Sequence, residues 1–175
     1  MDSVKILMAI DSLPRGGRER RMISLIKELN NLGGHHIELL LFKDVVEYRE
    51  EVLSLDLTKH IIKRQPKKDP RVFYKVYRLL KEIRPDIVHV WANMSMIYVI
   101  PAAKLLRIPI LNGSIVNAPV RSRWYHGEQI RTRFGFPFSK IIVSNSQAGL
   151  KAYHASPAKS VCRRDHPLAS LHLTQ

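Results

Sequence analysis

The spacing of hydrophobic positions changes several times along the chain, and each change marks a predicted element. Val4–Ile10 is an unbroken apolar run, which is typical of a parallel strand covered on both faces. Over residues 18–32 apolar side chains recur every three or four positions, which predicts an amphipathic helix. Residues 37–42 are apolar again and predict a second strand. The chain therefore opens with a strand–turn–helix–strand unit.

The rest of the chain continues this alternation. Further strands are predicted at 60–63, 87–91, 108–115 and 140–143. Further helices are predicted at 70–84, 96–106, 127–133 and 147–154. Asp69 and Pro70 suit the start of one helix, Asn93 or Ser95 suits the cap of the next, and Pro101 should kink or shorten it.

Strands that alternate with helices predict the fold class, a three-layer α/β/α Rossmann-like domain with a mainly parallel sheet of about six or seven strands. We place this domain at residues 1–157. Residues 158–175 follow neither the helical nor the strand period, so we expect an atypical, poorly ordered tail.

The turn after the first strand is the first candidate site. Pro14, Gly16 and Gly17 interrupt the apolar pattern at the carboxyl end of a strand, where open parallel sheets bind ligands. Adjacent glycines allow a sharp bend and a close approach to the backbone. The first amides of the following helix lack intrahelical partners and favour an anion. The same residues also fit a tight structural turn that holds no ligand.

The charge of the chain bears on its partners. Twenty-nine Lys and Arg against 15 Asp and Glu leave a formal net charge of +14, which suits an acidic partner. We interpret Lys75, Arg78 and Lys81 as a solvated helix face. The cationic residues expected to favour an anionic membrane surface lie among aromatic residues further on, and are Arg121, Arg123, Arg131 and Arg133. The few aromatics form no stacking motif, so nucleic acid is not a predicted partner.

The chain lacks the sequence signatures of several other classes of protein. The single cysteine, Cys162, rules out an internal disulfide, and no cluster of Cys and His predicts a metal. A dinucleotide G-x-G-x-x-G motif and a P-loop Gly-Lys-Ser/Thr motif are both missing around Gly17. No run approaches the roughly 20 apolar residues of a spanning helix. We expect a cytoplasmic protein, with peripheral association at the inner membrane face left open.

Four motifs, in order, resemble the N-terminal domain of GT-B glycosyltransferases of the group 1 type, family 4. Gly16-Gly17-Arg18-Glu19-Arg20 matches the family's GG-x-E-R turn, and RPDIVHVW at 84–91 is similar to its R-P-D-[IV]-[IV]-H strand. IPILNGSIVNAP and KIIVSNSQAGLKAY follow in the family's order. The resemblance covers about residues 4–159.

The resemblance implies a retaining, hexosyltransferase-type reaction. A sugar would pass from a nucleotide-diphosphate sugar, the co-substrate, to a polysaccharide or lipid-linked acceptor of cell-envelope polysaccharide synthesis, with no metal or other cofactor. In the family the N-terminal domain mainly holds the acceptor, and its Gly-rich turn faces the donor diphosphate. That role would fall here to Gly16, Gly17, Arg18 and Glu19.

The loops after the predicted strands would form the acceptor cleft. We name as its candidates Trp91, Asn93, Ser114, Asn117 and Asn145. No catalytic residue is assigned. His89 lies within a strand, and we interpret it as packed and hydrogen-bonded rather than catalytic. An exposed cleft face should also favour self-association.

The chain departs from the family in its glutamates and in one histidine. The family's C-terminal domain has two glutamates eight positions apart, whereas here no pair has that spacing and the last glutamate is Glu128. Many members place a histidine after the fifth strand, where this chain reads Asn112-Gly113-Ser114. We therefore expect the C-terminal donor-binding domain to be absent and the isolated chain to be inactive. The alternative is a non-enzymatic nucleotide- or anion-binding Rossmann-like domain.

Overall fold

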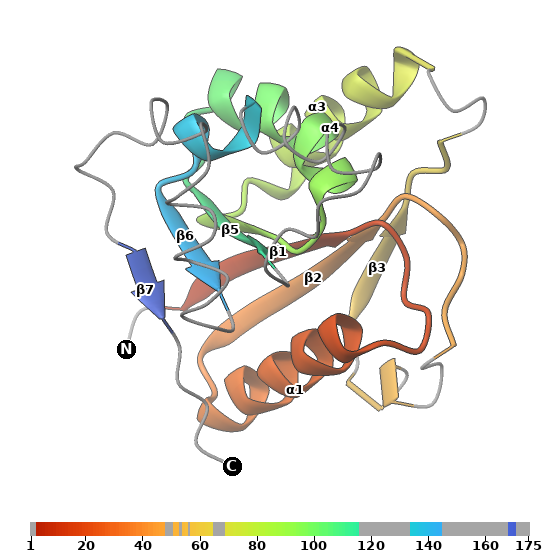
Figure 1. Cartoon of the computed structure of the whole chain (residues 1–175), viewed down its shortest axis with the longest axis vertical. Helices are drawn as coiled ribbons and strands as arrows, with labels where there is room; N and C mark the ends of the chain where they lie inside the picture. Colours follow the sequence, from red (N-terminus) through yellow and green to blue (C-terminus); the bar gives the residue numbers. More distant parts are fainter. Residues whose placement is uncertain are drawn as a thin grey trace, which may run out of the picture.

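A parallel sheet of seven strands forms the centre of the computed structural model, which describes residues 3–47, 51–52, 54–55, 57–64, 69–115, 134–144 and 168–170 (Figure 1). The strands are β1 (Val4–Ile10), β2 (His35–Leu41), β3 (Thr58–Ile61), β4 (Ile87–Val90), β5 (Ile110–Ile115), β6 (Ile141–Ser144) and β7 (Leu168–Ser170). Their order is β3-β2-β1-β4-β5-β6-β7, and each neighbouring pair is parallel. The predicted fold class is confirmed.

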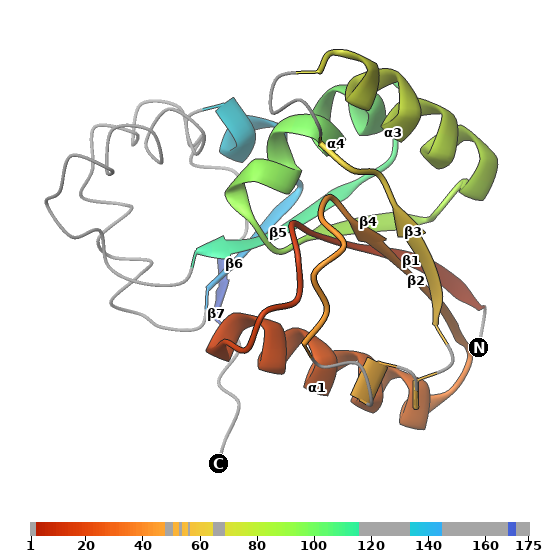
Figure 2. The same ribbon diagram turned by 90° about the vertical axis from the view of Figure 1, so that its right-hand side faces the viewer.

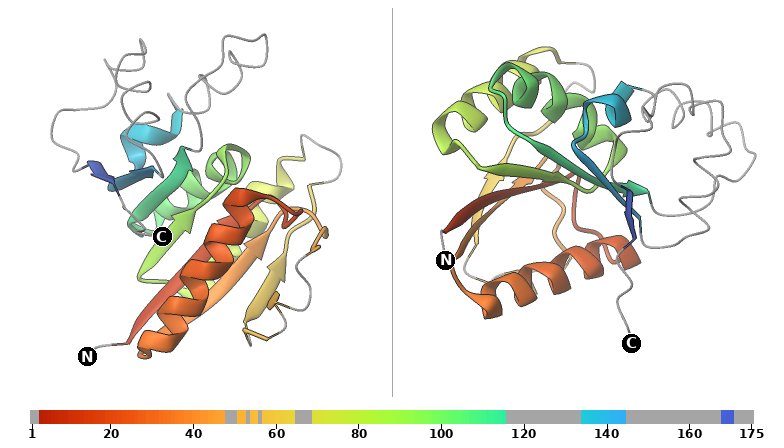
Figure 3. Two further views of the ribbon diagram at one scale, coloured as in Figure 1. Left: turned by 60° about the horizontal axis from the view of Figure 1, so that its bottom comes forward. Right: turned by 90° about the vertical axis from the view of Figure 1, so that its left-hand side faces the viewer.

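Helices lie on both faces of this sheet. On one face lies α1 (Gly17–Leu32), and on the other α3 (Arg71–Ile83) and α4 (Asn93–Leu105) pack side by side (Figures 1 and 2). A short 3-10 helix, η1 (Phe136–Phe138), precedes β6. In the right-hand view of Figure 3 the strands lie between α1 and the pair α3 and α4. These are the three layers that the alternating pattern predicts.

Each face of the sheet has its own apolar cluster. Leu7 and Ala9 of β1 pack with the buried faces of α3 and α4, while Met8 and Ile10 pack with Met22 and other residues of α1. Successive side chains of a strand point to opposite faces, so β1 contributes to both clusters and is buried on both sides. This is why its sequence is an unbroken apolar run rather than an alternating one.

The predicted boundaries differ from the structure in a few places. β3 begins two residues earlier than predicted, and α4 begins at Asn93 rather than at Met96. The cap position of α4 is Ala92, with no side-chain cap, so the prediction that Asn93 or Ser95 caps this helix is wrong. α4 continues through Pro101 to Leu105 and is not shortened there.

One further prediction differs from the structure, and two predicted helices cannot be compared with it. The strand β7 lies in the stretch expected to be a poorly ordered tail, and the sequence pattern does not predict it. The helices predicted at 127–133 and 147–154 lie outside the described residues.

Candidate functional site

The switch point of the sheet lies between β1 and β4. These two strands are neighbours, and the chain leaves β1 toward α1 on one face and β4 toward α4 on the other (Figure 2). Ligands of open α/β sheets bind in the crevice that such a divergence leaves beyond the carboxyl ends of the strands. Asp11 directly follows β1, and Trp91 directly follows β4, so both lie at this edge.

A hydrogen bond crosses the switch point. The hydroxyl of Ser95, in the first turn of α4, donates to Oδ1 of Asp11 over 2.7 Å. The backbone carbonyl of Asp11 also accepts the amides of Phe42 and Lys43, which ties the end of β1 to the end of β2. Sequence reasoning did not select Asp11 or Ser95 as site residues, and named Ser95 only as a candidate helix cap. The sequence did offer one signal for Asp11, which is an acidic residue directly after the first strand, at the edge where ligands bind.

His89 and Trp91 stack on the face of the sheet that α1 covers. Their ring centroids are 4.6 Å apart, and each residue is about 8% exposed. Burial lowers the pKa of His89 to about 3, so the imidazole is neutral at physiological pH. The prediction that His89 is packed is confirmed. The prediction that it is hydrogen-bonded is wrong for Nε2, which has no partner among the residues that the structure describes.

Within the described residues, four buried side-chain atoms near the ends of β4 and β5 have no hydrogen-bond partner. They are His89 Nε2, Trp91 Nε1, Asn93 Oδ1 and Ser114 Oγ. An unpaired buried polar group costs about 1–3 kcal/mol, so native proteins keep few of them, and those that persist are often part of a functional site. Three of the five acceptor-cleft candidates, Trp91, Asn93 and Ser114, therefore lie close to the ends of β4 and β5 with polar atoms unsatisfied.

Gly113 leaves room in front of the imidazole. A Cβ added to this residue would lie 3.0 Å from His89 Nε2, which is tighter than ordinary side-chain packing. The bare backbone at this position of β5 thus borders the unpaired nitrogen of β4.

Asn112 holds β5 in place beside this site. Its buried amide nitrogen donates to Ser139 Oγ and contacts Met96 Sδ, each over 3.0 Å, and its Oδ1 accepts the amide of Ser114 over 3.0 Å. The strand is thereby joined to α4 and to the segment before β6. These bonds fix the backbone of Ser114.

The Gly-rich turn differs from its predicted form. Gly16 is the cap residue of α1 in an extended conformation, and neither Gly16 nor Gly17 has a positive φ. A Cβ on Gly16 would collide with the carboxylate of Glu19, whereas one on Gly17 would meet nothing within 4 Å. The interpretation that both glycines serve a sharp bend is therefore wrong. Gly16 is small because Glu19 lies against it.

Glu19 itself is buried, at 4% exposure, in the first turn of α1. Its Oε1 accepts a hydrogen bond from Arg18 Nε over 3.2 Å. A carboxylate at a helix N-terminus is stabilised by the helix dipole. The four predicted anion-binding residues are consecutive in this turn, and Glu19 supplies a negative charge that is paired with Arg18.

Some predicted residues cannot be compared with the structure. Asn117, Asn145 and the arginines at 121, 123, 131 and 133 lie outside the described residues. Within the described ranges, no group of three or more His, Cys, Asp or Glu side chains is placed to hold a metal ion. The helices of the described part are all too short or too polar to cross a membrane.

Solved structures share the fold. Crystal structures of Anabaena Alr3699/HepE in complex with UDP and glucose, of the S. aureus MnaA–UDP complex and of Acinetobacter baumannii MurG match with TM-scores of 0.67, 0.72 and 0.62. Sequence identities are 18%, 13% and 16%, and the matches cover 96%, 95% and 83% of this chain. They cover only 44%, 44% and 42% of the matched chains, so this chain spans less than half of their length.

The comparison with curated proteins gives no match. A family model described as "Glycosyltransferase Family 4" matches residues 15–155, which is well over half of the chain. This range begins at the Gly-rich turn and includes β4, β5 and the unpaired polar atoms at their ends. The motifs and the parallel sheet agree with this match, and the chain belongs to Glycosyltransferase Family 4.

Proposed function

We propose that this chain is the acceptor-side half of a retaining, hexosyltransferase-type glycosyltransferase. The donor would be a nucleotide-diphosphate sugar, and the acceptor a polysaccharide or lipid-linked glycan of the cell envelope, at the cytoplasmic face of the membrane. Membership of the family and the likeness to structures solved with UDP or with UDP and glucose support the reaction class.

The observation that carries the acceptor role is the chemistry of the unpaired atoms. Trp91 Nε1 can only donate a hydrogen bond, Asn93 Oδ1 can only accept one, and Ser114 Oγ can do both. His89 Nε2 is neutral and donates or accepts according to its tautomer. None of the four groups carries a charge. Such a set suits the hydroxyl groups of a neutral sugar, which also donate and accept, better than it suits an anion.

The turn at Gly16 to Glu19 would play a secondary part. Its helix amides favour the donor diphosphate, but the buried Glu19 carboxylate opposes a second negative charge nearby. We therefore expect the isolated chain to hold a nucleoside diphosphate weakly. Transfer requires the donor and the acceptor to be held against each other, and positioning of this kind is worth on the order of 7–11 kcal/mol in favourable cases. The chain alone should transfer no sugar.

The test is a titration of the ¹⁵N-labelled chain, followed by NMR of the Trp91 indole. Neutral oligosaccharides should shift the Trp91 indole N–H signal and should shift it less in a His89→Gln variant. A parallel incubation with radiolabelled nucleotide sugars and membrane extract should leave the lipid and polymer fractions unlabelled. If only UDP or phosphate shifts the signals of the chain, the non-enzymatic anion-binding alternative is favoured. Turnover by the chain alone would refute its inactivity.

A further inference from the structure

The opposite edge of the sheet carries a separate basic surface. The turns that lead into β4, β5 and β6 all lie at the amino ends of parallel strands, and therefore at one edge. Two open hollows of about 510 and 540 Å³ are present there, and both are lined by Arg107, Ile108 and Pro109. The hollows are therefore contiguous, and they lie across the sheet from the switch point.

Five cations line these hollows. They are Lys81, Arg84, Lys104, Arg107 and Lys140. Within the described residues none of the five is in an ion pair, and Asp86 is the only acidic residue of the lining. Oδ2 of Asp86 already accepts the backbone amide of Lys5 over 2.8 Å. The surface therefore has a large excess of positive charge for an external anion to balance.

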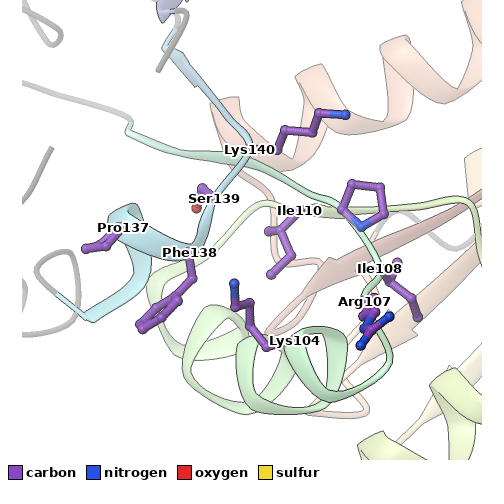
Figure 4. A pocket seen from close by; sticks show the side chains of 9 residues that line it. Lys104, Arg107, Ile108, Ile110, Pro137, Phe138, Ser139 and Lys140 are labelled. Atoms are coloured by element: carbon purple, nitrogen blue, oxygen red, sulfur yellow. The ribbon is translucent and has the colours of Figure 1, made fainter. Parts of the chain in front are cut away.

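Exposed apolar side chains lie among these cations. Leu105, in the last turn of α4, is 75% exposed, and Phe138 of η1 is 41% exposed. Phe138 packs against the equally exposed Phe134, with ring centroids 5.9 Å apart, and Lys104 Nζ lies 5.3 Å from the Phe138 ring centre. Figure 4 shows the Lys104 side chain directed toward Phe138 across the hollow. A site for a soluble phosphate would gain nothing from exposed Leu and Phe.

Two of the arginines adopt an uncommon backbone conformation. Arg84 ends α3 with φ 46°, and Arg107 follows α4 with φ 57°. Helices usually place glycine or asparagine in this left-handed conformation, because a Cβ makes it unfavourable. A cation near a helix C-terminus gains only a modest amount from the dipole. A non-glycine residue in such a conformation at two points of one surface indicates that the side chain itself is used there.

We propose that this edge, formed by Lys81, Arg84, Lys104, Arg107, Lys140, Leu105 and Phe138, docks the protein on a membrane that contains anionic phospholipid. The lysines and arginines neutralise headgroup phosphates, while Leu105 and Phe138 enter the boundary between headgroups and acyl chains. This surface differs from the arginines at 121–133 that sequence reasoning favoured. It does not rest on the proposed reaction, since lipid binding and sugar transfer use opposite edges of the sheet.

The experiment is co-sedimentation of the full chain with vesicles of phosphatidylcholine alone or with 30% phosphatidylglycerol. Binding should require phosphatidylglycerol and should fall steeply between 50 mM and 500 mM NaCl, because exposed charges are screened. The variant Lys104→Gln/Arg107→Gln/Lys140→Gln should bind roughly 100-fold more weakly, since each cation near an anionic surface contributes about fivefold. Leu105→Ser should weaken binding several-fold at both salt concentrations.

A matched control separates this surface from the overall charge. Lys27, Lys43 and Lys59 are exposed and lie on α1, after β2 and on β3, away from the hollows. Lys27→Gln/Lys43→Gln/Lys59→Gln removes the same three charges and should bind within about twofold of the unmodified chain. Circular dichroism of each variant confirms that it is folded.

Three results would overturn the proposal. The first is an equal loss of vesicle binding in the two triple variants. The second is equal binding to vesicles with and without phosphatidylglycerol. The third is a Leu105→Ser variant that binds as tightly as the unmodified chain. Complete competition by millimolar pyrophosphate with no effect of Leu105→Ser would assign the hollow to a soluble anion instead.

Discussion

The carboxylate of Glu19 occupies the space that a Cβ on Gly16 would fill, at the start of α1. The first of the two adjacent glycines could therefore carry a side chain only if the Glu19 carboxylate moved, although the backbone of Gly16 is extended and unstrained. Glu19 also places a buried negative charge in the turn that faces the switch point. The two glycines therefore have different roles, and substitution can separate them.

Gly16→Ala should lower the free energy of unfolding by about 1–2 kcal/mol, because the new Cβ displaces the buried Glu19 carboxylate. Gly17→Ala is the matched control. A Cβ there meets nothing within 4 Å, and alanine loses less backbone entropy in a helix than glycine does, so stability should rise by up to about 1 kcal/mol. Urea denaturation measures both values. In a Glu19→Ala background the penalty of Gly16→Ala should disappear, and a penalty that persists would contradict this account.

His89 should make the stability of the protein depend on pH. Its folded pKa of about 3 lies below the ordinary value of 6.5, so the unfolded chain binds a proton first as the pH falls. Stability should therefore fall from pH 6.5 toward pH 3, by at most about 1.4 kcal/mol per pH unit from this group. His89→Gln should remove that part of the slope. Urea titrations at pH 7, 6 and 5 give the free energy of unfolding of both proteins. If that free energy changes equally with pH in the two proteins, His89 is protonated or exposed in the folded state.

Asn112 should be one of the most sensitive buried polar positions. Asn112→Ala leaves Ser139 Oγ and the Ser114 amide without their shared partner, and should cost about 2–4 kcal/mol. Ser139→Ala removes the bond from Asn112 and the bond that Ser139 Oγ donates to the carbonyl of Gly135, while Asn112 still contacts Met96 and Ser114, and it should cost about 1–2 kcal/mol. Thermal and urea denaturation rank the two variants. A smaller loss for Asn112→Ala than for Ser139→Ala would contradict the role of Asn112 as the link between β5, α4 and β6.

Glu38 links three strands through its carboxylate. It accepts Lys5 Nζ over 3.0 Å and bonds to His60 Nε2 over 2.5 Å, and His36 Nε2 lies 3.2 Å away. Burial alone would raise the pKa of Glu38, but the hydrogen bonds from His60 and Lys5 outweigh it, so the pKa lies below its ordinary value of 4.5.

Because the folded pKa is depressed, the stabilisation by Glu38 is complete above about pH 4.5 and is lost as the pH falls through the lowered pKa. Glu38→Gln should therefore cost about 2 kcal/mol at pH 7, and the difference between the two proteins should narrow below pH 4.5. Urea, which unlike guanidinium does not screen charges, is the denaturant for this comparison. A difference that stays constant from pH 7 to pH 3.5 would show that the charge of Glu38 contributes nothing.

Much of the sheet was predictable from the sequence because its central strands β1, β2 and β4 are largely buried. The apolar run of β1 and the helical period of α1 and α3 are local patterns, and they depend little on distant residues. β7 was not predictable, since three residues carry no period. The predicted start of α4, Met96, is too late because Asn93 and Ser95 resemble capping residues. In the structure both belong to the first turn of the helix, where Ser95 bonds to Asp11.

The sequence predicted which edge of the sheet holds the site, but it did not predict the individual atomic contacts there. Trp91, Asn93 and Ser114 follow from the rule that parallel sheets bind ligands at their carboxyl edge. The hydrogen bond between Ser95 and Asp11 joins residues 84 positions apart, and the unpaired nitrogen of His89 depends on the absence of a side chain at Gly113 in the next strand. Such relationships are set by register, which a hydrophobic pattern does not specify residue by residue.

The length of β1 has a consequence for the acceptor. β1 has seven residues, and at about 3.3 Å per residue a parallel strand of that length spans roughly 20 Å between the two edges of the sheet. A protein that rests on phospholipid by the turns before β4, β5 and β6 would hold Asp11 and Trp91 about that far above the headgroups. A sugar attached directly to a lipid would not reach so high, whereas the free end of a glycan several residues long would. The length of the strands, which sets the distance from the membrane to the site, would then select acceptors by their length.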